Sequence, residues 1–240
     1  MEPVCVNTVE QLNDMPQIYR DLLIRQTTVH TEGELSGADD YATIFYPIAP
    51  NAYEKRVCCE RAAEEVDHFM RGAKVLAEIG VDVSFMLDQD LSERNLYATE
   101  AVKDIKTWEE RALFSFLGEA AVLDQLTEMA ESSYRPLAAI FPKILRDERV
   151  HVAHGYRITR SYCKSDEGRE KIQAALATWW PRTLDLFGTS TSERSRLNVE
   201  WGLRQYTNEA ARNRFIAKTR PKLESLGLDV PSDVEGRKFL

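Results

Sequence analysis

Two Glu-x-x-His motifs, at residues 65–68 and 148–151, most constrain the fold of this 240-residue chain. Residues three apart on a helix lie on one side, so each motif presents a carboxylate and an imidazole together. A single Glu precedes each motif, Glu34 by 31 residues and Glu119 by 29. This spacing fits one helix, a turn and part of a returning helix. Each single Glu can therefore face its motif across an antiparallel helix pair.

Helical periodicity covers nearly the whole chain, and alternating β-branched runs of strand length are absent from the sequence. The expected long helices span residues 16–37, 50–80, 104–131, 133–163 and 166–187, with a sixth from an N-cap in 189–193 to about 219. Pro142 predicts a kink or local break in the fourth helix. A short helix is expected within residues 81–95. No linker rich in Gly, Ser or Pro interrupts this pattern, so we expect one domain spanning residues 1–240.

The motifs and the single acids form one set of candidate ligands. Its members are Glu34, Glu65, His68, Glu119, Glu148 and His151. One Glu from each of two helices plus Glu-x-x-His from each of two others is typical of ferritin-like dimetal carboxylate bundles. We therefore predict an all-α, ferritin-like four-helix bundle with additional C-terminal helices. Oxygen donors with one imidazole per metal favour two iron ions, with manganese second, over zinc or copper.

The alternative interpretation places these acids on a solvated helix face. Glu119 argues against it, because this residue lies within the apolar run at residues 114–123. A lone carboxylate in such a setting is costly to bury without a cation. The spacing therefore favours a metal centre whose ligands also define the catalytic site.

Other polar residues near the motifs have weaker predictions. Asp147 is expected to accept a hydrogen bond from the non-ligating N–H of His68. Asp67 is interpreted as a surface residue. His30 and His154 each lie one helical turn from a predicted ligand, and either could face the site. A capped or surface role for His30 and a solvent-facing position for His154 are the simpler interpretations.

Composition limits the partners and the compartment. The net charge of -8 disfavours a nucleic-acid partner. No apolar run approaches the roughly 20 residues of a membrane span, and no secretory signal is recognisable. Four Cys residues without a CxxC pair favour a cytoplasmic location. The sequence has no dinucleotide or Walker motif, so electrons for an oxidation would come from a separate reductase.

Several further segments resemble the phenylacetic acid catabolic family. These are residues 15–37, Tyr134-Arg135-Pro136 through Gly155, Trp179-Trp180-Pro181 with Phe187-Gly188, and residues 207–231. The resemblance implies a di-iron monooxygenase of a multicomponent system, which inserts one oxygen atom from O2 into an organic substrate. An aromatic acyl-CoA thioester, epoxidised on its ring, or a related biosynthetic intermediate is the implied small-molecule substrate.

The resemblance also carries site residues and partners. The implied ligands are Glu34, Glu65, His68, Glu148 and His151, together with the acid of the third helix. In the family that acid can be an Asp one position earlier, where this chain has Gly118 and then Glu119. A second copy of the chain or a structural subunit is the implied protein partner. A ferroxidase or metal-storage bundle, and a non-catalytic subunit of an oxygenase, are the alternative functions.

Overall fold

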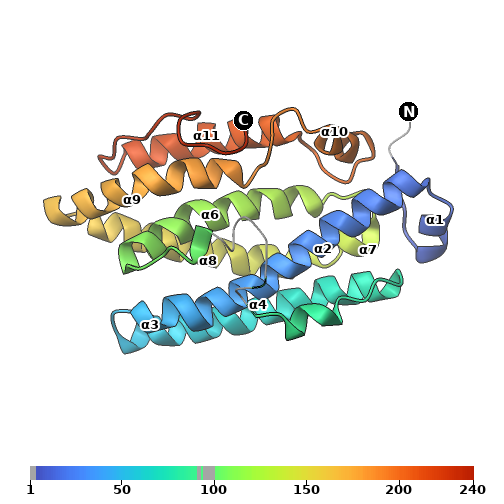
Figure 1. Ribbon diagram of the computed structural model, residues 1–240, viewed down its shortest axis with the longest axis horizontal. Coiled ribbons are helices and arrows are strands. Elements are labelled where there is room, and N and C mark those ends of the chain that lie inside the picture. Colours follow the sequence, from blue (N-terminus) through green and yellow to red (C-terminus); the bar gives the residue numbers. More distant parts are fainter. Residues whose placement is uncertain (1–3, 91–92, 94–100) are drawn as a thin grey trace. The chain divides into compact units, whose positions relative to one another are not determined.

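The computed structural model describes residues 4–90, 93 and 101–240, and every regular element in this part of the chain is a helix (Figure 1). One isolated parallel bridge joins Val6 and Tyr134. The all-α prediction is confirmed, and the helices pack as in a helical bundle. None of the described helices combines the length and the apolar composition that crossing a bilayer demands.

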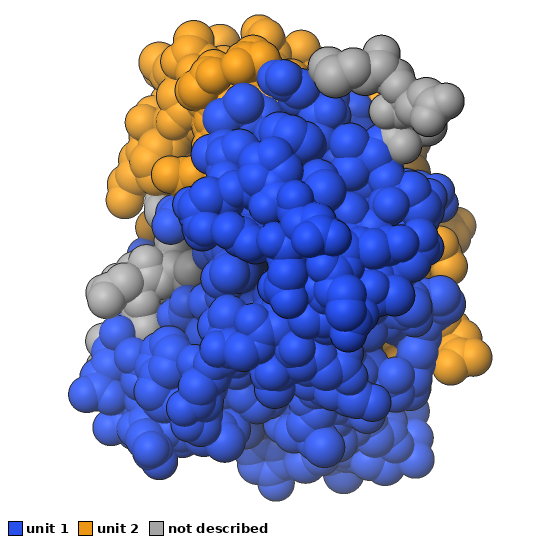
Figure 2. All heavy atoms as spheres, turned by 90° about the vertical axis from the view of Figure 1, so that its right-hand side faces the viewer, with its two compact units in different colours: residues 1–104, 128–144, 197–205 blue, residues 105–127, 145–196, 206–240 orange. Residues whose placement is uncertain are grey.

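The chain divides into two compact units (Figure 2). Unit 1 contains residues 1–104, 128–144 and 197–205, and unit 2 contains residues 105–127, 145–196 and 206–240. The expectation of a single domain over residues 1–240 stays a prediction.

Unit 1 is built on two long helices, α2 and α4. Its elements are α1 (Val9–Asn13), α2 (Gln17–Asp39), the π-helix η1 (Asp40–Phe45), α3 (Tyr46–Ile48), α4 (Ala52–Glu78), the 3-10 helix η2 (Ser84–Asp88) and α7 (Arg135–Ala138). The side chain of Asn51 accepts a hydrogen bond from the backbone N–H of Glu54 and so caps α4. The predicted helices at 16–37 and 50–80 are therefore confirmed. The short helix expected within 81–95 is η2, although residues 91, 92, 94 and 95 lie outside the described part.

Helices α2 and α4 lie side by side and run antiparallel (Figure 1). Gly37 on α2 faces Glu65, whereas Thr31, earlier on α2, faces Gly72, later on α4. Apolar side chains of both helices and of the following segment form a buried cluster of Leu35, Phe69, Leu76, Val83 and Met86. This packing fixes which faces of α2 and α4 meet.

Unit 2 holds most of the remaining helices. They are α6 (Trp108–Met129), α8 (Phe141–Tyr162), α9 (Asp166–Asp185), α10 (Glu193–Glu200) and α11 (Asn208–Glu224), and α6, α8 and α10 each have one end among the residues of unit 1. The helix is interrupted between α7 and α8. Pro142 lies in the first turn of α8, where a backbone N–H would have no partner within the helix, so its absence does not destabilise α8. The break predicted from Pro142 is confirmed.

The predicted single helix from residue 193 to 219 is wrong, because α10 and α11 are separate helices. Gly202 has a φ of 69°, a left-handed conformation that ends α10. The backbone N–H of Leu203 then bonds to the carbonyl of Asn198. Thr207 caps α11 by accepting from the N–H of Ala210. These local hydrogen bonds outweigh the helical periodicity across the break.

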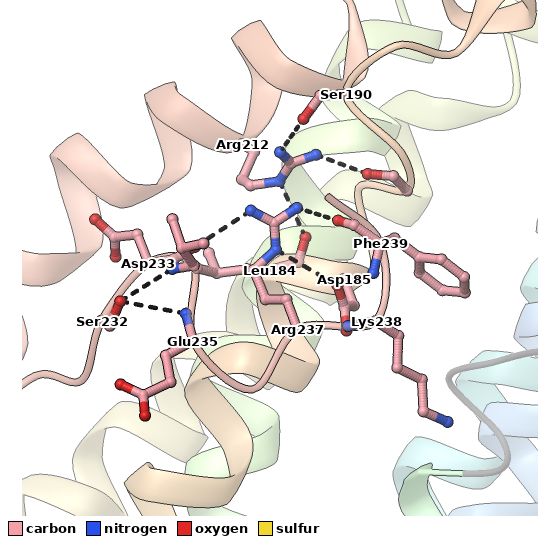
Figure 3. Close-up of polar contacts among 12 residues, drawn as sticks. Leu184, Asp185, Ser190, Arg212, Ser232, Asp233, Glu235, Arg237, Lys238 and Phe239 are labelled. Carbon is pink, nitrogen blue, oxygen red and sulfur yellow. Dashed lines mark hydrogen bonds and ion pairs between the residues drawn. The ribbon is translucent and has the colours of Figure 1, made fainter.

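The C-terminal strap, residues 232–240, packs on α9 and α11 within unit 2 (Figure 3). The buried carboxylate of Asp185 accepts hydrogen bonds from the backbone N–H of Lys238 at 2.7 Å and of Phe239 at 3.0 Å. The guanidinium of Arg237 lies 3.5 Å from the same carboxylate. Buried charge and backbone donors therefore hold the strap in place.

Candidate metal centre

Unit 1 contributes a first half-site made of Glu34, Glu65 and His68. Glu34 comes from α2, and the other two come from α4. All three are buried, and each offers one ligand atom within 4.8 Å of the others. The Nδ1 atom of His68 lies 3.1 Å from Oε2 of Glu34 and 3.6 Å from Oε2 of Glu65. One imidazole nitrogen thus faces two carboxylates, a donor set suited to a divalent cation.

The electrostatic environment of the first half-site favours an anionic Glu34 and a protonated His68. Burial by itself would raise the pKa of Glu34, but His30 and His68 outweigh it and hold that pKa well below its usual range. Burial likewise opposes a charged His68, yet its hydrogen bonds to Glu34 and Glu65 raise its pKa to about 11. A proton on His68 therefore lies between carboxylate oxygens. A divalent cation would supply the same compensation of charge.

Unit 2 holds the residues of a predicted second half-site, which are Glu119, Glu148 and His151. Glu119 lies on α6, and the Glu-x-x-His pair lies on α8. All three are buried. Oε1 of Glu148 lies 3.5 Å from Nδ1 of His151. The hydroxyl of Ser115, one turn earlier on α6, donates to Oε1 of Glu119 at 2.9 Å. The second half-site stays a prediction, with the same set of donor groups as the first.

Comparison with known proteins shows the family of this chain. The phenylacetic acid catabolic protein family matches residues 4–238. The chain belongs to this family. One of the subunits of 1,2-phenylacetyl-CoA epoxidase from Escherichia coli (strain K12) is 25% identical over 227 residues, which cover 93% of this chain and 73% of that protein. The resemblance inferred from the sequence is confirmed at the level of the family.

In this family member, a glycine extends each Glu-x-x-His motif by one turn. Gly72 follows His68 by four residues, and Gly155 follows His151 by four. A Cβ added to Gly72 would lie 2.2 Å from Oγ of Thr31 on α2. One added to Gly155 would lie 2.6 Å from the backbone nitrogen of Phe116 on α6. In each unit, the glycine lets the motif helix approach the helix that carries the single Glu.

The sequence reasoning assigned no packing role to either glycine, although Gly155 ends one of the segments that resemble the family. The signal was present in the sequence, as the repeated pattern Glu-x-x-His-x-x-x-Gly at residues 65–72 and 148–155. The packing role of each glycine depends on which neighbouring helix it contacts. Spacing within one helix does not identify that neighbour.

Glu119, and not position 118, offers a carboxylate at the predicted place on α6. Gly118 has no donor atom, and a Cβ at this position would lie 2.6 Å from the ring of Phe114. Glu119 is buried, with Ser115 as a hydrogen-bond donor. The role of Glu119 as a ligand stays a prediction.

The other polar residues near the motifs differ in how far their side chains are exposed to solvent. Asp67 is a surface residue as predicted, with its side chain 41% exposed and paired with Lys143 at 3.0 Å. The side chain of Asp147 is 14% exposed, and its predicted bond to the imidazole of His68 stays a prediction. His30 and His154 are both buried, so neither is a surface residue. His30 contacts Glu34 directly, and His154 accepts a hydrogen bond from the buried Arg111 at 3.4 Å.

Proposed function

We propose that this protein is the oxygen-activating subunit of a di-iron monooxygenase. The observation that carries the proposal is the buried cluster of Glu34, Glu65 and His68 in a chain of this family. The three residues of the predicted second half-site are also buried. Each half-site provides two carboxylates and one imidazole. Together they supply four negative charges, which balance two divalent cations.

The proposal requires a metal ion at each half-site. Glu34, Glu65 and His68 would hold one ion of the pair, and Glu119, Glu148 and His151 the other. The donors are mostly oxygen with one imidazole per metal, a set that suits iron better than zinc or copper. When bound, such a pair supplies the redox chemistry that reduces dioxygen and oxidises an organic substrate.

The chain's own side chains prepare the centre for this chemistry. The carboxylate of Glu34 remains charged, as its low pKa indicates, so it presents anionic oxygens without a preceding loss of a proton. Burial excludes bulk water, which strengthens the attraction between cations and carboxylates. Close helix packing at Gly72 and Gly155 fixes the backbone next to both imidazoles.

Family membership suggests the substrate and the partners. We propose an aromatic acyl-CoA thioester, or a chemically related intermediate, as the molecule that receives the oxygen atom. The similar Escherichia coli protein belongs to 1,2-phenylacetyl-CoA epoxidase. No dinucleotide or Walker motif occurs in the sequence, so a separate reductase would deliver the electrons. A structural subunit or a second copy of the chain is the proposed protein partner.

Anaerobic reconstitution with Fe(II) tests the proposal. Iron per chain is counted, and then 18O2, a chemical reductant and a panel of acyl-CoA thioesters are added. The expected result is two iron ions per chain and one 18O atom in a thioester product, detected by mass spectrometry. Iron uptake with oxygen consumption but no labelled product would favour a ferroxidase. A chain that binds no iron would indicate a non-catalytic subunit.

Variants connect this result to the half-sites. His68→Ala and His151→Ala are each expected to lower iron occupancy sharply while helical content is retained. Asp67→Asn is the matched control, because Asp67 adjoins His68 on α4 but has an exposed side chain. Unchanged iron stoichiometry in both histidine variants would contradict the ligand assignment.

A further inference from the structure

Each single Glu accepts a hydrogen bond from the residue four positions earlier on its own helix. In unit 1, Nδ1 of His30 lies 3.0 Å from Oε1 of Glu34. In unit 2, Oγ of Ser115 donates to Oε1 of Glu119 at 2.9 Å. The two half-sites thus share the position of this donor but differ in its chemistry, since one is an imidazole and the other a hydroxyl.

The bond from His30 divides the two oxygens of Glu34 between different partners. Oε1 faces His30, and Oε2 faces His68 at 3.1 Å. A carboxylate with one oxygen held by a donor has its rotamer fixed and its other oxygen directed at a metal. Glu34 is therefore already oriented for ligation through Oε2.

His30 is itself firmly held. Its side chain is 5% exposed, and its ring centroid lies 5.3 Å from that of Phe141. The Nε2 atom of His30 is buried and has no hydrogen-bond partner among the described residues. The imidazole of His30 thus makes its polar contact through Nδ1, with Glu34.

Ser115 is held by the backbone of α8. The residue is fully buried, and a Cβ added to Gly155 would lie 2.7 Å from Cβ of Ser115. The glycine one turn after His151 therefore packs against the residue that orients Glu119. Its hydroxyl is small enough to fit beneath α8 and still reach the carboxylate.

We propose that His30 and Ser115 are positioning residues, each of which holds one oxygen of a single Glu ligand and directs the other oxygen to a metal ion. Each residue controls the affinity of one ion of the pair. This inference depends on the proposed function, since it presupposes that metal binds at both half-sites. It assigns roles to two side chains outside the predicted set of ligands.

Anaerobic titration with cobalt(II) tests the inference, because cobalt accepts the same donors and its visible absorption reports coordination geometry. The variants are His30→Leu and Ser115→Ala, which remove the donors, and His30→Asn, whose amide nitrogen takes the place of Nδ1. Thr27→Val is the matched control, because Thr27 is buried on α2 and donates to a backbone carbonyl. Circular dichroism checks that each variant is folded.

We expect wild type to bind two cobalt ions. His30→Leu and Ser115→Ala should each lower the affinity for one cobalt ion by about tenfold to a hundredfold, as is typical when a hydrogen-bond partner of a metal ligand is removed. Each should also alter the absorption of that ion. His30→Asn and Thr27→Val should behave as wild type.

The outcomes separate the two proposals. Wild-type affinity and absorption in both His30→Leu and Ser115→Ala would overturn the inference and leave the proposed function standing. Fewer than two ions in wild type would overturn both. If His30→Leu does not fold, His30→Gln replaces it, because its amide reaches the position of Nε2 rather than Nδ1. Equal affinities in the Gln and Asn variants would then overturn the role of His30.

Discussion

The Oε2 atom of Glu34 on α2 lies 3.1 Å from Nδ1 of His68 on α4, and both side chains are buried. The pair carries one negative and one positive charge, because the pKa of Glu34 is held low and that of His68 is raised to about 11. A metal ion bound at this half-site would therefore compete with a proton for the same imidazole nitrogen.

This competition predicts that metal binding releases a proton. His68 is protonated below its pKa of about 11, and a metal requires the neutral imidazole. As pH rises toward that pKa, the proton is removed more easily, so affinity should rise by about tenfold per pH unit for one proton. Calorimetry in buffers of different ionisation enthalpy measures the release. Asp67→Asn should release the same number of protons, and no release from wild type near neutral pH would contradict the prediction.

Close helix contact predicts that Gly72→Ala and Gly155→Ala each destabilise the fold by about 1–3 kcal/mol, the usual cost of overpacking. The cost should be greater at Gly155, where the added Cβ meets backbone atoms of α6. Replacing Thr31 by Ala should relieve Gly72→Ala, since that Cβ meets a side chain. Urea unfolding measures each free energy.

Gly33→Ala is the control for the glycine variants. It lies on α2 with nothing within 4 Å of an added Cβ. Alanine favours the helix there by up to about 1 kcal/mol, so this variant should be stabilised. Equal destabilisation of all three glycine variants would refute the role of close contact.

The C-terminal strap predicts a strong effect of Asp185→Asn. The carboxylate accepts from two backbone N–H groups and lies next to Arg237, and an amide cannot satisfy all these donors. The expected cost is about 1–3 kcal/mol or more, the range for leaving buried donors unsatisfied. Hydrogen exchange at Lys238 and Phe239 should accelerate. Asp166→Asn, with a 93% exposed side chain, should leave both stability and exchange unchanged, and equal effects of the two variants would argue against this prediction.

Local signals in the sequence predicted most of the helices. Pro142 placed a break that the structure contains, and the apolar periodicity of residues 16–37 and 50–80 matched α2 and α4. The π-helix at Asp40–Phe45 was not predicted, because no residue type reliably marks it. The break around Gly202 was missed because its stabilising bonds, to Asn198 and Ser133, depend on tertiary packing as well as on local sequence.

The candidate site was also predictable only where local sequence spacing identifies its residues. Motif spacing identified Glu34, Glu65 and His68, which the structure brings together. It did not assign a role to His30, because a buried partner for Glu34 is recognised only when the exposure of both residues is known. The hydrogen bond from the backbone N–H of Lys238 to Asp185 joins residues more than fifty positions apart, and helical periodicity does not reveal such a contact.

Anomalous diffraction at the iron edge, from crystals of the reconstituted protein, would locate the metal ions themselves. We expect two iron peaks, one next to the imidazole of His68 and the other next to that of His151, with Glu34 and Glu119 among the ligands. A single peak, or iron bound away from these six side chains, would contradict the proposed di-iron centre.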